Sequence, residues 1–130
     1  MKKVVVIFLV LSTYCAVAQT PKVLDGKGVY TQYCLPCHQE DGTGVPNLNP
    51  PLRKSDWVNG DRNRLIKVIL EGLDEEIEVN GETYNRVMAA HSFLTDKQVA
   101  DVLTYIRSNF GNTSDAIKEE EVKALRKKKP

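Results

Sequence analysis

The residues Cys34-Leu35-Pro36-Cys37-His38 form the centre around which this 130-residue chain is organised. On a helical turn, thiols at positions i and i+3 project to the same side, and the next side chain lies beside them. Two cysteines at this spacing, followed at once by a histidine, match the pattern of c-type haem attachment. In that pattern the thiols bond the two vinyl groups and the histidine ligates the iron. The stretch therefore predicts one covalently bound haem c, with its iron, held by Cys34, Cys37 and His38.

Without the histidine, such a cysteine pair also fits a zinc half-site, a thioredoxin-like redox pair or a local disulfide. Zinc needs four ligands, but the only other cysteine is Cys15 in the N-terminal leader, and His91 alone would not complete a site. A redox pair is expected beside a βαβ pattern, which this sequence lacks. Haem attachment is favoured, and a redox dithiol is the main alternative.

The first 18 residues have the pattern of a secretory signal peptide. It consists of basic Lys2 and Lys3, an apolar run over 4–11, and the cleavage site Ala16-Val17-Ala18. The signal peptide would direct export to the periplasm, and cleavage after Ala18 would remove Cys15. Acylation of Cys15 as a lipoprotein anchor is a less favoured alternative, because the bulky Tyr14 stands where small residues are expected. An uncleaved anchor is also considered, although the apolar run is too short to span a bilayer.

Charge and size narrow the range of functions. Removing Lys2 and Lys3 would take the formal net charge from +1 to −1, and no face is basic enough to indicate nucleic-acid binding. The mature chain would have 130 − 18 = 112 residues, and a chain of that length buries only a modest fraction of its surface. An enclosed haem would therefore supply much of the missing apolar interior.

Caps and apolar spacing predict the elements of the chain. Asp25 is expected to cap a helix over 28–34, which carries the haem motif at its C-terminal end. The Gly/Pro-rich segment 39–55 is expected to form an extended loop. A second helix over 62–71 follows Asp61 (or Asn59) and stops at Gly72.

Further along, strands at 76–79 and 82–84 flank Asn80-Gly81, the pair that a type I′ hairpin prefers. Thr95 and Gln98 form a capping box for a helix that runs toward Gly111. We divide the chain into a signal peptide (1–18), a haem domain (19–111) and a charged tail (112–130) that forms a short surface helix and frays over 127–129.

A haem iron held by His38 has a second axial position to fill. After removal of the leader, Met88 is the only methionine and His91 the only other histidine. A thioether ligand opposite a histidine raises the reduction potential, as in cytochromes with His/Met ligation. We expect Met88 to be the second axial ligand; the alternative is that it only fills the core. His91 is better explained as a surface histidine, or one beside the ligands, than as a ligand itself.

Taken together, the pattern resembles a class I monohaem c-type cytochrome, over roughly residues 25–111. The likeness is carried by Tyr33 to Gln39 with Gly42 and Gly44, Pro50-Pro51-Leu52 with Trp57, Val79 to Met88, Leu94-Thr95-Asp96 and Val102 to Arg107. The resemblance implies an all-α, cytochrome c-like fold. In such a fold, three core helices surround the haem, a small β-hairpin precedes the distal Met loop, and a short helix ends the chain.

The resemblance also implies roles for individual residues. Family members attach haem at the positions of Cys34 and Cys37, with His38 as proximal and Met88 as distal ligand. The backbone carbonyl of Pro50 would accept a hydrogen bond from the other nitrogen of the imidazole, which orients the ring and increases its basicity.

Weaker assignments concern the surroundings of the haem. Trp57 and Arg53 are candidate partners of the haem propionates; packing and a solvated cation are their alternatives. Gly28 and Tyr105 are expected where the first and last core helices cross. Many relatives carry a proline after the distal methionine and a glycine two residues before it, where this chain has Ala89 and Arg86. These departures predict a less rigid Met loop.

With both axial positions filled, the iron has no vacant site for a substrate. We therefore expect a monomeric, non-enzymatic electron carrier that exchanges single electrons with redox proteins, a donor dehydrogenase and an acceptor oxidase or reductase, through small transient interfaces. One alternative is a five-coordinate haem with a peroxidase or gas-sensing role. Another is a cytochrome subunit of a larger, membrane-associated dehydrogenase or oxidase complex, with the tail as its docking element.

Overall fold

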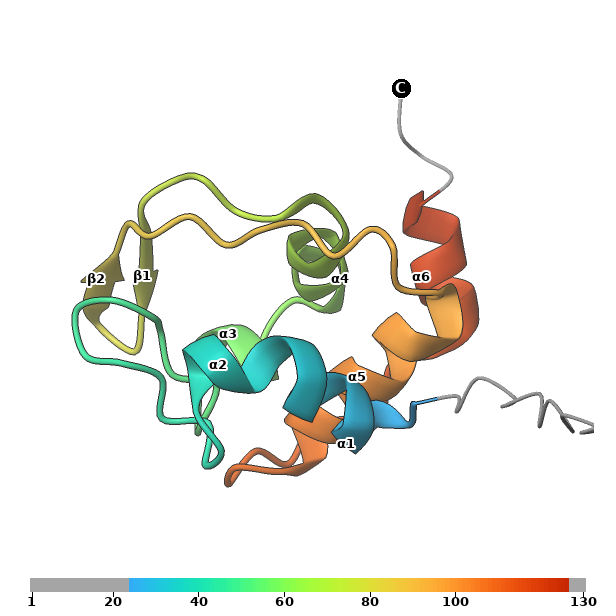
Figure 1. Cartoon of the computed structure of the whole chain (residues 1–130), viewed down its shortest axis with the longest axis horizontal. Coiled ribbons are helices and arrows are strands. Elements are labelled where there is room, and N and C mark those ends of the chain that lie inside the picture. The colour runs from blue at the N-terminus through green and yellow to red at the C-terminus, as the bar shows by residue number, and fades with distance from the viewer. Residues whose placement is uncertain (1–23, 127–130) are drawn as a thin grey trace, which may run out of the picture.

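The computed structural model describes residues 24–126 (Figure 1). The predicted signal peptide, Cys15 and the end of the tail lie outside the described residues. The fold is mostly helical with a two-stranded antiparallel sheet, as predicted; the arrangement of three core helices around a haem stays a prediction. No helix within residues 24–126 is long and apolar enough to cross a membrane. The elements are α1 (Gly26–Val29), the π-helix η1 (Tyr30–Cys34), α2 (Leu35–His38), α3 (Asp56–Asn59), α4 (Arg62–Glu71), β1 (Ile77–Val79), β2 (Glu82–Tyr84), α5 (Asp96–Ser108) and α6 (Glu119–Arg126).

The first helical segment carries the cysteine-histidine motif at its C-terminal end, as expected. It starts where the Asp25 carboxylate accepts a hydrogen bond from the Gly28 N–H at 2.7 Å. It is not a uniform α-helix, because the Leu35 N–H bonds to the Tyr30 carbonyl five residues earlier. Pro36 has no N–H, so the regular bonding pattern loses a donor at this turn. A widened turn therefore ends at Cys34, directly before α2 with Cys37 and His38, a placement common for π-turns at functional sites.

The local signals in the middle of the chain are confirmed. Asp61 caps α4, and the capping box of Thr95 and Gln98 is formed at the start of α5. Asn80 and Gly81 have φ of 53° and 83° between β1 and β2, as a type I′ turn requires. Helix α5 ends at Ser108, earlier than the apolar pattern suggested, and the short α3, which Ser55 caps, was not predicted.

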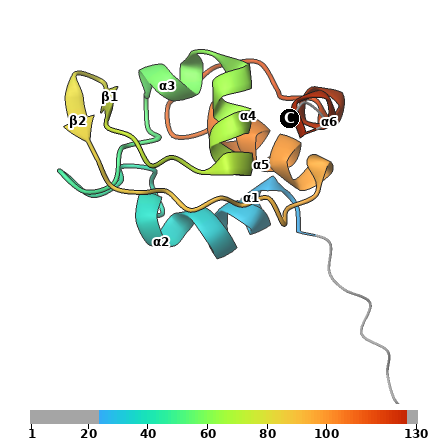
Figure 2. The ribbon, with the colours of Figure 1, turned by 90° about the horizontal axis from the view of Figure 1, so that it is seen from above.

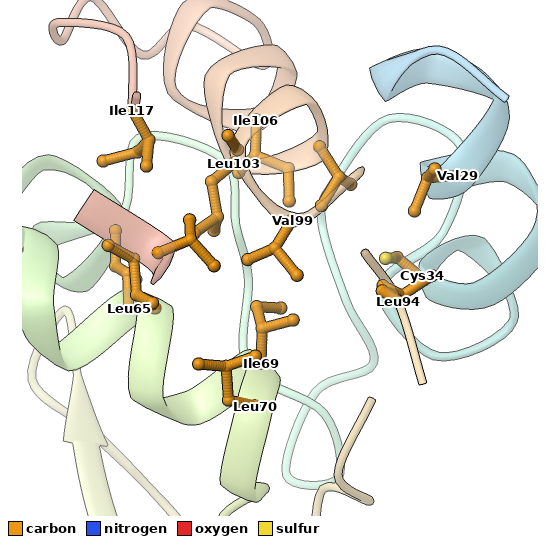
Figure 3. Close-up of a cluster of buried hydrophobic side chains, with 14 of the residues drawn as sticks. Val29, Cys34, Leu65, Ile69, Leu70, Leu94, Val99, Leu103, Ile106 and Ile117 are labelled. Atoms are coloured by element: carbon orange, nitrogen blue, oxygen red, sulfur yellow. The ribbon is translucent and has the colours of Figure 1, made fainter. Parts of the chain in front are cut away.

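The core lies where α4 and α5 face each other, with α1 crossing α5 on its other side (Figure 2 and Figure 3). The crossing requires glycine at Gly26, since a Cβ there would lie 2.7 Å from the Asp101 carbonyl carbon and 3.1 Å from the Cβ of Tyr105. The assignment of Gly28 to this crossing is wrong. A Cβ at Gly28 would meet only side-chain atoms of Asp25 and Leu24, because Gly28 lies on a different face of α1.

The C-terminal segment packs against the domain. Ile117 and Val122 are buried, and α6 contacts both α4 and α5. In both views α6 lies at the opposite end of the molecule from the hairpin (Figure 1 and Figure 2). The amide of Asn112, the first residue of the predicted charged tail, donates to the carbonyls of Leu52 and Ile106, each at 2.9 Å. The tail is thus built into the fold.

Candidate haem site

A cavity of about 320 Å³ lies beside the cysteine-histidine motif. Its apolar wall comes from α4, the hairpin and the segment that joins them. All of the expected site residues except Arg53 line it, and so does His91. The expected residues that line the cavity are Cys34, Cys37, His38, Pro50, Trp57 and Met88. The tertiary structure therefore brings residues from separate parts of the chain to one cavity. Wall residues not anticipated include Leu73 before the hairpin, and Ile77, Val79 and Tyr84 within it. The alternation along the hairpin was the available signal for the last three.

The His38 imidazole is oriented by a backbone carbonyl. Its Nδ1 lies 3.0 Å from the carbonyl oxygen of Pro50. Because a carbonyl only accepts, Nδ1 must carry the proton, which leaves Nε2 with a lone pair for a metal. Burial lowers the pKa of His38, and the charge of His91 acts in the same direction, while the Pro50 hydrogen bond opposes them. The neutral form that can bind a metal is therefore favoured.

The two cysteines are free thiols in different environments. Cys34 is buried and Cys37 is exposed. Burial, followed by the charge of Cys37, raises the pKa of Cys34 to about 11. At neutral pH this thiol is therefore almost entirely protonated, whereas the thiolate is the form that attacks in redox exchange. The environment of Cys34 thus lacks the activation typical of an attacking redox cysteine.

Met88 is held by its backbone. Its N–H donates to the Leu73 carbonyl at 2.8 Å, and its carbonyl accepts from the Leu73 N–H at 2.9 Å. Gly72, with φ of 79°, lets these two segments approach, since a Cβ there would lie 2.6 Å from the Met88 carbonyl oxygen. This pairing supplies order that we did not expect in a loop lacking the usual proline and glycine.

Trp57 and Arg53 are placed differently from each other. The Trp57 indole N–H donates to the Glu78 carbonyl at 2.7 Å, and the guanidinium of Arg64 stacks 3.9 Å from its ring centre. The N–H is thus already used in packing α3 against the hairpin. Arg53 forms an exposed ion pair with Asp41 at 3.6 Å and does not line the cavity.

His91 lines the cavity on the segment after Met88. Its backbone N–H donates to the Ile69 carbonyl at 2.7 Å, and its ring lies 5.7 Å from that of Phe93. Its Nδ1 is buried without a hydrogen-bond partner among the described residues. Within residues 24–126, the ring packs against aromatic neighbours such as Phe93.

The residues present fit a haem c. Two thiols, an imidazole and a thioether line one cavity, and its surface is largely apolar. Imidazole and thioether are ligands suited to iron, and an apolar shell sets its reduction potential.

Comparison with known proteins supports this fit. The cytochrome c family model matches residues 23–110. A cytochrome c-552 of Thermus thermophilus is 38% identical, with 99% of this chain and 89% of that protein aligned. A second cytochrome c-552 from the same species is 40% identical over 81% of this chain and 86% of its own length. The fructose dehydrogenase cytochrome subunit of Gluconobacter japonicus is 33% identical over 81% of this chain, which spans 22% of that subunit. The chain therefore belongs to the cytochrome c family, as a class I c-type cytochrome that binds haem c covalently and carries electrons.

Proposed function

We propose that Cys34 and Cys37 hold the haem through thioether bonds, and that His38 and Met88 are its two axial ligands. The observation that carries this proposal is the hydrogen bond from His38 Nδ1 to the Pro50 carbonyl at 3.0 Å. It leaves the other ring nitrogen for the iron, and the anchored Met88 lines the same cavity.

When bound, the haem supplies an iron that cycles between the ferric and ferrous states. The chain keeps the surroundings of that iron constant. Pro50 holds the imidazole in one orientation and one tautomer. The pairing of Met88 with Leu73 restricts the thioether segment. An unchanged ligand set keeps the structural rearrangement on electron transfer small.

Replacement of Met88 by alanine tests the ligand assignment. We expect the ferric holoprotein to lose the charge-transfer band of methionine-ligated haem and its midpoint potential to fall. The matched control is Asn85→Ala, which truncates an exposed side chain of the same loop that does not line the cavity and should leave both unchanged. An unaltered band and potential in the Met88 variant would refute the assignment.

We propose further that the protein is an independent, monomeric carrier in the periplasm, without catalytic activity. The two cytochromes c-552 support independence, since nearly their whole length aligns with this chain. The dehydrogenase subunits keep open the alternative of a domain within a larger complex. Sedimentation of the native holoprotein separates these: a single species of the mass of one chain supports the carrier, and co-sedimentation with a dehydrogenase supports the subunit.

The proposed partners are a donor dehydrogenase and an acceptor oxidase or reductase. Because α6 packs onto α4 and α5, deleting the tail would disturb the domain itself and would not report cleanly on docking.

The five-coordinate alternative predicts rapid carbon monoxide binding to the ferrous protein, whereas the proposed ligand set predicts slow binding limited by release of Met88.

A further inference from the structure

Arg126, at the end of α6, clamps the segment that follows the Met88 loop. Its Nη1 donates to the Ser92 carbonyl at 2.8 Å and its Nη2 to the Leu94 carbonyl at 2.7 Å. Its Nε donates to the Asp96 carboxylate at 2.6 Å. The guanidinium therefore ties together the end of this loop and the first turn of α5.

The loop is fixed on its other side by backbone contacts. Met88 pairs with Leu73, and the His91 N–H donates to the Ile69 carbonyl at 2.7 Å. Only residues 89–91 separate Met88 from the first carbonyl that Arg126 holds. Movement of the Met88 backbone away from the haem would have to be taken up over this short stretch.

Helix α6 is itself a firm support for this contact. The Arg62 guanidinium makes two hydrogen bonds to the Glu121 carboxylate, at 2.9 and 2.7 Å. Val122 is completely buried one turn before Arg126. In Figure 1 the segment that enters α5 passes beside α6. The clamp thus joins two ordered parts of the fold.

We propose that Arg126 is a positioning residue for the distal ligand, which keeps the Met88 thioether on the iron by restraining residues 92–96. The proposal rests on the ligand set proposed above. It gives the C-terminal helix, which lies beyond the matched residues 23–110, a role in the stability of the iron-sulfur bond. Hydrogen bonds from a charged donor are among the stronger ones in proteins, so their loss should favour the open loop.

The test is imidazole binding to the ferric holoprotein, which requires displacement of Met88. We expect Arg126→Ala to bind imidazole about tenfold faster, the factor expected for loss of a charged hydrogen-bond group. Arg126→Lys keeps the positive charge but lacks the fork of guanidinium donors, so its rate of imidazole binding should lie between those of the parent protein and Arg126→Ala. The matched control is Arg62→Ala. The Arg62 side chain bonds to Glu121 and to the Ala116 carbonyl, and not to residues 92–96. Its loss therefore weakens α6 without removing the Arg126 hydrogen bonds.

The outcomes separate the two proposals. If the parent protein lacks the charge-transfer band of methionine-ligated haem, the ligand assignment itself fails. If the band is present and Arg126→Ala binds imidazole at the parent rate, the positioning role is refuted. Equal acceleration in Arg126→Ala and Arg62→Ala would also refute it, because the effect would then come from general loosening of α6.

Discussion

Replacing Gly26 by alanine should destabilise the protein strongly, because this glycine lets α1 cross α5 in direct backbone contact. A Cβ at Gly26 would lie 2.7 Å from the Asp101 carbonyl carbon and closer still to its oxygen. Backbone atoms cannot rotate away, so the two helices would have to separate. Overpacking of this kind costs about 1–3 kcal/mol, and alanine recovers at most about 1 kcal/mol of backbone entropy. A net loss of about 1–2 kcal/mol corresponds to a fall in Tm of about 4–16 °C for a domain of this size.

The assay is thermal and denaturant unfolding of the holoprotein, followed by far-ultraviolet circular dichroism. The matched control is Gly28→Ala in the same helix. There a Cβ would meet the Asp25 carboxylate at 3.1 Å and the end of the Leu24 side chain at 3.2 Å, and both can move. We expect that variant to change the free energy of unfolding by less than about 1 kcal/mol. A Gly28 variant less stable than the Gly26 variant would refute this account of the crossing.

Three further predictions concern contacts away from the iron. Asn112→Ala should cost about 1–3 kcal/mol in unfolding free energy, because it leaves the part-buried Leu52 carbonyl without its amide donor, whereas the Ile106 carbonyl keeps the Asn109 N–H. Burial raises the pKa of Tyr30 well above its ordinary value, so an alkaline spectrophotometric titration should find one tyrosine, absent in Tyr30→Phe, that ionises only on unfolding. The Arg62 hydrogen bond lowers the pKa of Glu121 in the folded state below its ordinary value of 4.5. This pair contributes stability above that value and loses it as the pH falls through the lowered pKa. Glu121→Gln should therefore reduce stability at neutral pH, by about 1 kcal/mol or less for so exposed a pair, and the difference should disappear in acid-titrated unfolding curves.

The local elements could be predicted because their signals act over a few residues. The cap of α4, the capping box of α5 and the turn at Asn80-Gly81 all depend on side chains within one turn of the backbone that they serve. The π-turn at Tyr30–Cys34 was not predicted. Pro36 lacks a backbone N–H, but that alone does not determine which carbonyl the preceding Leu35 N–H bonds to.

The sequence by itself predicted a covalently bound haem through the spacing of Cys34, Cys37 and His38, because attachment depends on that local pattern, and the family match confirmed it. The tertiary structure alone decided how the far side of the site is built. The pairing of Leu73 with Met88, the hydrogen bond from the Trp57 indole to Glu78 and the hydrogen bond from Arg126 to Leu94 join segments far apart in the sequence. Such contacts carry no periodicity or motif. They depend on how α4, the hairpin and α6 pack, and packing is a property of the whole chain.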